Sequence, residues 1–344
     1  MFVANDGFSA GHVVRTIAIA KALVRRAARR AIDTRLLLAT TSEADPLLRE
    51  PELVVVRLPA PATARGAKFS DDERRRLVRG VIEGALGSFG PDLLVVDTFP
   101  SGPHDELAGI ATDAKRALVR RAVPAEKARE AALARGLDAF DLAIVAGDPG
   151  IVDVSLPVPA LHVPPITISE ARLARDEART RLGLARDGRI ALVASGGGGD
   201  ADAAAHASTI ARALEGAEPG LTVVRARGPL DRESDDALRI APLAPYLSAF
   251  DVAFTSAGYN TSHELAKARV PTVLWAEPRP YDDQAARVDR FVKAGHAVLL
   301  ADFTSGAIAS ALERARALRP AKMETGGADR AADALLDLAT GGRR

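Results

Sequence analysis

The sequence predicts an α/β protein made of two doubly wound domains, each built on a mostly parallel sheet. Short apolar runs of the kind found in buried parallel strands alternate with amphipathic helical segments along most of the 344 residues. This alternation occurs twice, before and after a proline-rich stretch at residues 155–165. A chain of this length exceeds what one hydrophobic core usually serves, so we expect two Rossmann-like domains.

The first series supplies an N-terminal domain, which we place at residues 1–163. Its predicted strands are the mostly apolar residues 2–5, 36–38, 53–56, 93–97 and 142–145. Predicted helices between them begin at His12 and cover residues 70–88 and 125–135. In the helix that begins at His12, apolar residues recur every three or four positions, which indicates one buried face. The arginines on its other faces are typical of a solvated surface.

The second series supplies a C-terminal domain, which we place at residues 164–325. Its predicted strands are residues 189–195, 221–224, 252–255, 272–275 and 297–300. The boundary is drawn at Pro157, Pro159, Pro164 and Pro165, because prolines hold this stretch in extended conformations. A further helix is expected within residues 326–340.

Composition excludes several functional classes. The 46 basic residues balance 45 acidic ones, for a net charge of +1, so no electrostatic footprint for nucleic acid or an anionic membrane is present. The absence of cysteine excludes disulfides, thiolate metal sites and a cysteine nucleophile, and is compatible with a reducing cytosol. The first residues lack a basic segment followed by a long apolar run, so we expect no signal peptide, and the sequence contains no apolar run of ~18 residues. We therefore expect a cytoplasmic protein with no nucleic-acid partner and no transmembrane segment.

Residues 255–275 predict a strand end, a turn, a short helix and a second strand. Gly258 is expected to make the turn through a positive φ, and Asn260 or Thr261 to cap the helix. Amides at such a helix end favour phosphate. Glu264 lies one turn further in, on a face that can reach neighbouring hydroxyls. Taken alone, a turn followed by a helix is more typical of an ordinary αβ unit.

A second glycine-rich loop, residues 195–199, lies between a predicted strand and a predicted helix. Backbone amides at Gly197 and Gly198 could approach a phosphate there. The loop is not a Walker A motif, and Ala201 stands where the dinucleotide fingerprint has its last glycine. Without other signals, a flexible turn explains it equally well.

Two polar residues of the first domain, His12 and Asp97, lie just after or at the end of predicted strands. Gly11 and His12 begin a helix, where a neutral imidazole can take a proton from a hydroxyl, although a lone histidine there is more often a solvated or capping residue. Asp97 ends a strand, the place where open α/β sheets carry functional groups. It could orient His12, bind a substrate or cap its own loop.

Neither a metal ion nor a cofactor is expected. The adjacent carboxylates Asp282 and Asp283 diverge on a helix or a strand and chelate poorly together. The remaining histidines show no ligand-like spacing.

The joint pattern of the Gly258 turn, Glu264, a strand led by Pro271, and Asp283-Gln284 resembles the nucleotide-sugar motif of GT-B glycosyltransferases. It is similar above all to that of the lipid II-forming N-acetylglucosaminyltransferase. The resemblance is specific over roughly residues 238–300 and weaker elsewhere. It implies two Rossmann-like domains that face a central cleft, with the helix at 326–340 packed back on the first domain. Residues 97–102 also resemble a loop of predicted glycosyltransferases.

The resemblance implies a role for particular residues. Those assigned to the nucleotide-sugar donor are Gly197, Gly198, Ala241, Leu243, Gly258, Tyr259, Asn260, Thr261, Glu264, Asp283 and Gln284. In this assignment residues 258–261 receive the diphosphate, Glu264 holds the ribose, residues 283–284 hold the sugar, and backbone at 240–243 reads the base. Gly11 and Arg15 belong to the acceptor loop, with His12 and Asp97 as catalytic residues.

The implied activity is transfer of a hexosyl unit from a nucleoside-diphosphate sugar to a hydroxyl acceptor that the sequence does not identify. We expect a UDP-sugar, and a dTDP-sugar stays open as the alternative. Two alternatives stay open. Gly11-His12 and Arg15 are equally similar to the Gly-His-x-x-Arg of nucleotide-sugar hydrolases of the same fold, and a non-catalytic nucleotide-sugar-binding protein would share the donor motif. Two positions depart from the family pattern. Arg287 stands where many relatives have Asn, and we expect this change to alter sugar or phosphate contacts. Tyr259 replaces a smaller turn residue, and we expect its ring to stack on or crowd the donor.

Overall fold

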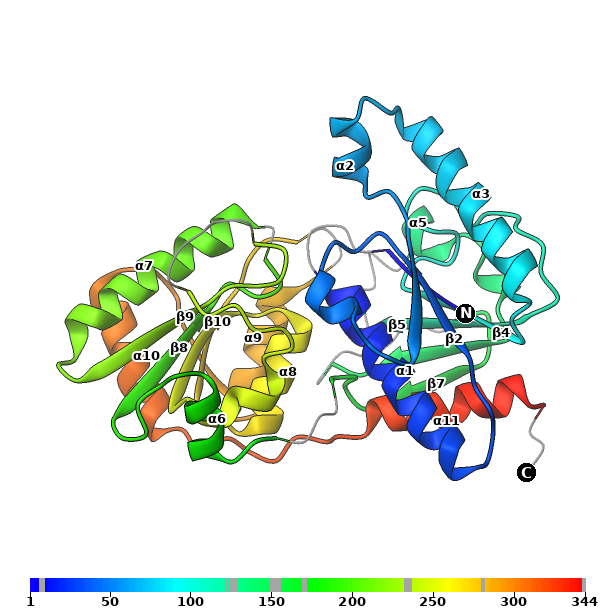
Figure 1. Cartoon of the computed structure of the whole chain (residues 1–344). Coiled ribbons are helices and arrows are strands. Elements are labelled where there is room, and N and C mark those ends of the chain that lie inside the picture. The colour runs from blue at the N-terminus through cyan, green and yellow to red at the C-terminus, as the bar shows by residue number, and fades with distance from the viewer. Residues whose placement is uncertain are drawn as a thin grey trace. The chain divides into compact units, whose positions relative to one another are not determined.

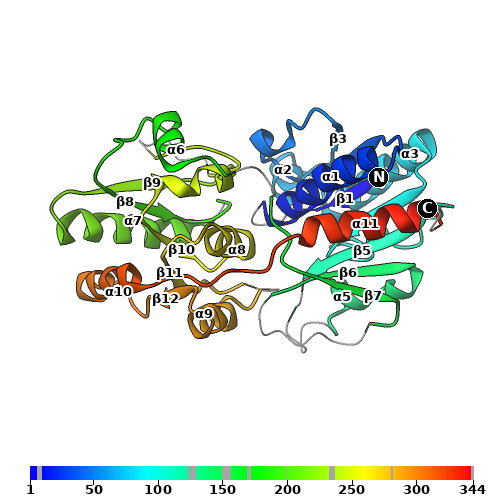
Figure 2. The ribbon, with the colours of Figure 1, turned by 90° about the horizontal axis from the view of Figure 1, so that it is seen from below.

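The computed structural model describes residues 1–5, 10–121, 123, 129–148, 156–168, 172–198, 200–231, 237–279 and 282–341. The chain divides into two compact units. The first unit comprises Met1–Ile166 and Gly326–Arg344, and the second comprises Thr167–Thr325. Each unit is built on one parallel sheet (Figures 1 and 2). No helix among the described residues combines the length and the apolar character needed to cross a bilayer.

The sheet of the first unit has the order β3-β2-β1-β4-β5-β6-β7, with every neighbouring pair parallel. Its strands are β1 (Phe2–Ala4), β2 (Leu36–Thr40), β3 (Leu53–Arg57), β4 (Leu93–Asp97), β5 (Lys115–Arg121), β6 (Leu142–Ala146) and β7 (Ala160–Val163). The chain proceeds outward from β1 on one side and from β4 on the other. The topological switch point therefore lies between β1 and β4, where open α/β sheets bind ligands beyond their strand ends.

Helices cover both faces of this sheet. They are α1 (Gly11–Arg29), η1 (Asp45–Leu48), α2 (Pro61–Gly66), α3 (Asp71–Phe89), α5 (Ala131–Ala134), η2 (Leu137–Ala139) and α11 (Gly327–Ala339). Helix α3 packs on one face through Val78, Ile82 and Leu86, against strand residues such as Leu94 and Val96. Helices α1 and α11 lie side by side on the other face (Figure 2).

Helix α11 is fastened to α1 by three ion pairs. Arg25 contacts Asp329 at 3.0 Å, Arg26 contacts Asp333 at 2.5 Å, and Arg30 contacts Asp337 at 2.7 Å. The aspartates are four residues apart, so they share one face of α11. Part of the basic surface of α1, expected to be solvated, is therefore paired. At the start of α11, a Cβ at residue 327 would overlap the carbonyl oxygen of Pro164, which explains the glycine there.

The sheet of the second unit has the order β12-β11-β10-β8-β9, again parallel throughout. Its strands are β8 (Arg189–Ala194), β9 (Leu221–Ala226), β10 (Val252–Ser256), β11 (Thr272–Trp275) and β12 (Ala297–Leu299). Its helices are α6 (Arg175–Arg181), α7 (Ala201–Ala217), η3 (Ala244–Ala249), α8 (Tyr259–Ala268), α9 (Gln284–Lys293) and α10 (Ser305–Ala317). The switch point lies between β8 and β10.

Alternate strand residues face opposite layers, as the period of a strand requires. In β8, Ala191 and Val193 pack against α7 and α10, whereas Ile190, Leu192 and Ala194 pack against α6, η3 and α8. Both faces are therefore buried from Ile190 onward, which explains why the strand is continuously apolar after the exposed Arg189.

The α/β architecture predicted from the sequence is confirmed, and all the predicted strands are present within one or two residues. Among the described residues, β5 and β7 were not predicted. The helix expected over residues 125–135 is seen only as α5, since residues 125–128 lie outside the described part of the chain. Residues 6–9, expected to form the turn before His12, lie outside it as well.

Candidate functional site

Three polar side chains meet at the switch point of the first sheet. His12 and Arg15 lie one turn apart on α1 and so face the same way, while Asp97 ends β4. The Nδ1 atom of His12 lies 2.6 Å from Oδ1 of Asp97. Arg15 donates from Nε to Oδ2 of Asp97 at 2.8 Å and from Nη2 to Oδ1 at 2.5 Å. The structure thus brings together three residues that are 85 positions apart at most.

Asp97 is ionised in this setting. Its side chain is buried, and that desolvation acts to raise the pKa; the charge of Arg15 and the hydrogen bonds from His12 and Arg15 outweigh it and lower the pKa of Asp97 to about 2. An ionised carboxylate can only accept hydrogen bonds, so Nδ1 of His12 carries the hydrogen in their contact. In the neutral ring the lone pair then lies on Nε2, the nitrogen able to accept a proton.

The residues after Asp97 hold it in place. Thr98 has φ of 63°, a left-handed conformation that is unusual for a β-branched residue and costs about 1–3 kcal/mol. Its hydroxyl accepts from Arg15 Nη2 at 2.8 Å and donates to Asp97 Oδ1 at 2.9 Å. The ring of Phe99 lies 5.9 Å from that of His12. The backbone strain at Thr98 therefore places a hydroxyl within the cluster.

A buried ion pair anchors the same loop to α3. Arg74 and Glu106 contact each other at 2.9 Å, and both side chains are essentially inaccessible to solvent. The second oxygen of Glu106 accepts from the backbone amide of His104 at 2.8 Å. Sequence reasoning did not single out this pair. The available signal was the position of Arg74 four residues before Val78, on the face of α3 that packs against the sheet.

In the second unit, the glycine-rich loop follows β8 at the switch point. Gly196 and Gly198 have φ of 89° and 84°, and a Cβ at residue 198 would lie 2.7 Å from the amide nitrogen of Asp231. The carbonyl of Gly197 accepts from the amide of Leu230 at 3.3 Å. Gly199 lies outside the described residues. The loop therefore needs its glycines for backbone conformation and for close packing.

The turn into α8 differs from the expectation. Gly258 is the N-cap and has φ of −63°, so the expected positive φ is wrong. The helix begins at Tyr259, so neither Asn260 nor Thr261 caps it, and no side chain does. The first intrahelical hydrogen bond runs from Ser262 to Gly258, which leaves the amides of residues 259–261 in a first turn where the helix itself supplies no acceptor.

The side chains of Tyr259 and Arg287 are buried beneath this turn. The Tyr259 ring lies 4.3 Å from that of His263 and 5.6 Å from the guanidinium carbon of Arg287. Arg287 donates to the carbonyl of Ala257 at 2.7 Å and to Asp282 at 2.6 Å. The expectation that the Tyr259 ring stacks on or crowds a ligand is therefore corrected, because the side chain is buried against His263 and Arg287 within the unit. Arg287 supports the turn from within the unit.

The other predicted donor residues take the following positions. Asp283 caps α9 by accepting from the amide of Ala286 at 2.8 Å, and Gln284 is buried and accepts from the amide of Glu277 at 3.0 Å. Ala241 and Leu243 are partly buried in the segment before η3, where Leu243 packs on the core. Asn260, Thr261 and Glu264 are partly exposed on α8. Gly11 is the first residue of α1.

The loops after β8 and β10 are adjacent. The hydroxyl of Ser256, which ends β10, lies 3.5 Å from the carbonyl oxygen of Ser195, which follows β8. The glycine-rich loop and the start of α8 therefore share the carboxyl edge of the second sheet. No group of three or more potential metal ligands gathers within the ranges that the structure describes.

No protein-family model matches the chain, and no curated protein matches it. Several solved structures do. Spinosyn forosaminyltransferase SpnP matches with a TM-score of 0.60 and 14% identity, over 98% of this chain and 94% of that chain. Spinosyn rhamnosyltransferase SpnG complexed with thymidine diphosphate matches at 0.58 and 17%, over 99% and 96%. Glycosyltransferase SsfS6 of Streptomyces sp. SF2575, also complexed with thymidine diphosphate, matches at 0.59 and 15%, over 99% and 95%.

Identities this low show a shared fold. The chain has, over nearly its whole length, the two-unit α/β fold of these glycosyltransferases, which is the GT-B fold predicted from the sequence. The narrower resemblance to the lipid II-forming enzyme stays a prediction.

Proposed function

We propose that the protein is a glycosyltransferase that moves a hexosyl unit from a nucleoside-diphosphate sugar to a hydroxyl acceptor. The observation that carries the proposal is the cluster of His12, Arg15 and Asp97 at the switch point of a sheet in a chain with this fold. A histidine held by a buried carboxylate is an arrangement that recurs in general-base catalysis.

In the proposed reaction, Nε2 of His12 takes the proton of the acceptor hydroxyl. The acceptor oxygen forms a bond to the anomeric carbon as the bond from that carbon to the diphosphate oxygen breaks. Asp97 keeps the ring in the required tautomer and stabilises the imidazolium. With a pKa of about 2 and four hydrogen-bond donors on its two oxygens, Asp97 has too little proton affinity to serve as the base itself. Arg15, being buried, acts by keeping Asp97 ionised.

The second unit supplies the donor site in this proposal. Amides of residues 259–261 and of the glycine-rich loop face the diphosphate, because both elements lie at the carboxyl edge between β8 and β10. The amide of Gly258 donates to the carbonyl of Ser256 at 2.8 Å, so Gly258 shapes the turn. Glu264 holds the ribose, Asp283 and Gln284 hold the sugar, and backbone near Ala241 and Leu243 reads the base. The sequence resemblance favours uridine, whereas two of the similar structures are complexes with thymidine diphosphate. Both are pyrimidine nucleotides.

The proposal is tested first by binding. UDP or TDP should raise the melting temperature, since a ligand that binds only the folded state stabilises it. Stabilisation by ADP or GDP and by neither pyrimidine nucleotide would contradict the base assignment. Glu264→Ala should weaken nucleotide binding by about 1–3 kcal/mol, the usual cost of a lost charged hydrogen bond. An unchanged affinity would remove Glu264 from the site.

Transfer is tested by intact mass. UDP-sugars and TDP-sugars are incubated with a panel of hydroxylated acceptors, and a product heavier by one hexosyl unit is expected. Acceptor-independent release of the nucleotide would indicate a hydrolase, and binding without turnover would indicate a binding protein. We propose that transfer needs no metal ion, so product formation should persist in EDTA. Loss in EDTA that magnesium or manganese restores would overturn this part.

A further inference from the structure

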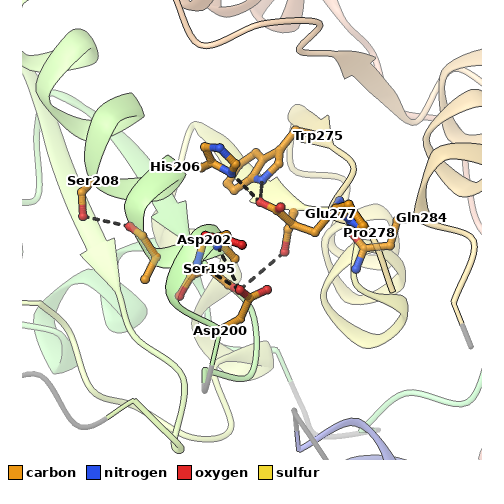
Figure 3. A network of polar contacts seen from close by, with 12 residues as sticks. Ser195, Asp200, Asp202, His206, Ser208, Trp275, Glu277, Pro278 and Gln284 are labelled. Carbon is orange, nitrogen blue, oxygen red and sulfur yellow. Dashed lines mark hydrogen bonds and ion pairs between the residues drawn. The ribbon is translucent and has the colours of Figure 1, made fainter. Parts of the chain in front are cut away.

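A buried carboxylate lies in the loop between β11 and α9. Glu277 is only 4% exposed, and its Oε1 accepts from the indole Nε1 of Trp275 at 2.6 Å. The same oxygen lies 2.8 Å from Nδ1 of His206 on α7. Figure 3 shows both rings directed at this carboxylate. The His206 ring is stacked on Phe303, with centroids 4.0 Å apart and planes 1° from parallel.

The backbone of Glu277 fixes the orientation of a second side chain. Its amide donates to Oε1 of Gln284 at 3.0 Å. A backbone amide can only donate, so the atom of Gln284 that faces it is the oxygen and not the nitrogen. The two ends of a planar amide point apart. The NH₂ group of Gln284 therefore points away from Glu277.

The loop is also tied to the glycine-rich loop through Asp200. Arg279 pairs with Asp200, the residue that caps α7 immediately after that loop. Burial of Asp200 acts to raise its pKa, but the hydrogen bond from Arg279 and those from the amides of Ala203 and Asp202 prevail and lower the pKa. The segment 277–279 is thus held to α7 at two points, on either side of Pro278.

We propose that Glu277, held by Trp275 and His206, is a positioning residue that orients the Gln284 amide so that its NH₂ group donates to an oxygen of the donor's sugar. The inference rests on the proposed function and deepens it. It names a polarity for the sugar subsite: the ligand supplies hydrogen-bond acceptors at this point, and the protein supplies donors. A buried donor of fixed orientation discriminates strongly against a ligand that leaves it unpaired.

Affinities for a nucleotide and for the matching nucleotide sugar separate the sugar contact from the rest of the site. The probes are UDP with UDP-glucose and TDP with TDP-glucose, used with the full-length protein in calorimetric titrations. Gln284→Glu keeps an oxygen for the Glu277 amide and replaces the NH₂ group by a second oxygen. We expect it to fold normally, to bind the nucleotide as the wild type does, and to bind the nucleotide sugar at least tenfold more weakly. Undiminished binding of the sugar form would overturn the proposal.

The positioning role is tested on Glu277 itself. Glu277→Ala should raise the KM for the nucleotide sugar several-fold and leave the Kd of the nucleotide unchanged, whereas Glu277→Gln, which keeps the accepting oxygen, should restore the wild-type value. Equal losses in both variants would mean that the carboxylate contacts the ligand directly, and would overturn the positioning role. A wild type that binds neither nucleotide would instead contradict the proposed function, independently of any variant.

A spectroscopic readout needs no turnover. Trp275 is the only tryptophan of the chain, so its indole N–H gives a single resonance in an NMR spectrum. That resonance should shift in His206→Ala, because both donors share one oxygen of Glu277. In the wild type, the nucleotide sugar should shift it further than the nucleotide alone. Identical spectra with both ligands would show that the network does not sense the sugar, and would refute the inference.

Discussion

Replacing Asp97 by Asn removes the charge at the centre of the proposed catalytic cluster. The ordinary pKa of an aspartate here is 3.8, and in the folded protein it is lowered to about 2. A difference of one pKa unit corresponds to about 1.4 kcal/mol, so the ionised carboxylate contributes about 2 kcal/mol to the free energy of unfolding at pH 7. Asn also leaves the 3% exposed Arg15 without an anionic partner, so we expect a loss of at least about 2 kcal/mol.

The loss should depend on pH with a definite sign. Because the folded-state pKa is the lower one, the stabilisation is complete above pH 3.8 and disappears as the pH falls toward 2. At pH 3 about half of it remains, so the gap between the wild type and Asp97→Asn should narrow by about 1 kcal/mol between pH 7 and pH 3.

Urea unfolding followed by far-UV circular dichroism at both pH values measures this gap. Trp275 lies in the second unit, so its fluorescence follows that unit separately and should not change. Asp138→Asn, an exposed carboxyl in the first unit, serves as the control and should cost almost nothing. A loss below about 1 kcal/mol at pH 7, or the same loss at both pH values, would refute the electrostatic account of the cluster.

Two further predictions concern the supporting structure. Glu106→Ala should destabilise the first unit by about 3–5 kcal/mol, because it leaves the buried charge of Arg74 without its anionic partner. The control Glu83→Ala, which breaks an exposed pair with Arg79, should cost under about 1 kcal/mol. Similar losses of both variants in urea unfolding would show that burial of the Arg74–Glu106 pair is unimportant. Gly198→Ala should lower the unfolding midpoint of the second unit, because residue 198 has φ of 84° and an added Cβ would overlap the backbone of Asp231. Gly258→Ala should leave this midpoint unchanged, because nothing lies within 4 Å of an added Cβ, but it should weaken nucleotide binding. A Gly258→Ala variant that binds nucleotide normally would remove that turn from the proposed site.

The fold was predictable where physical constraints act locally. Strand β4 was predicted at its observed bounds because both its faces are buried, which makes Leu93–Asp97 apolar up to the functional residue at its end. Strand β5 was not, because Lys115, Arg116, Arg120 and Arg121 obscure its apolar centre, although Arg120 itself is buried. Strand β7 was not predicted because prolines flank it on both sides; prolines are tolerated there because β7 is an edge strand of the sheet.

The candidate site was predictable in part, for a similar reason. The position of Asp97 at a strand end and of His12 at a helix start follows from local patterns, but their contact depends on β1 and β4 being neighbours, which only the sheet order reveals. The partners of Glu277 come from α7 and β11, 71 and 2 residues away, and no local spacing marks them. At Gly258 a local pattern led to a wrong prediction: a glycine in a turn suggested a positive φ, but the backbone there has φ of −63°.

The central claim is that His12 acts as the general base of glycosyl transfer, and the transfer rate of His12→Gln tests it most directly. Glutamine has a similar reach but cannot take a proton near neutral pH. With the donor and acceptor that the mass assay identifies, we predict that kcat falls by about 10²–10⁴-fold. The Kd of the donor should stay unchanged, because the proposed donor residues lie in the second unit. Turnover at the wild-type rate in His12→Gln would contradict the claim and leave His12 with a positioning role alone.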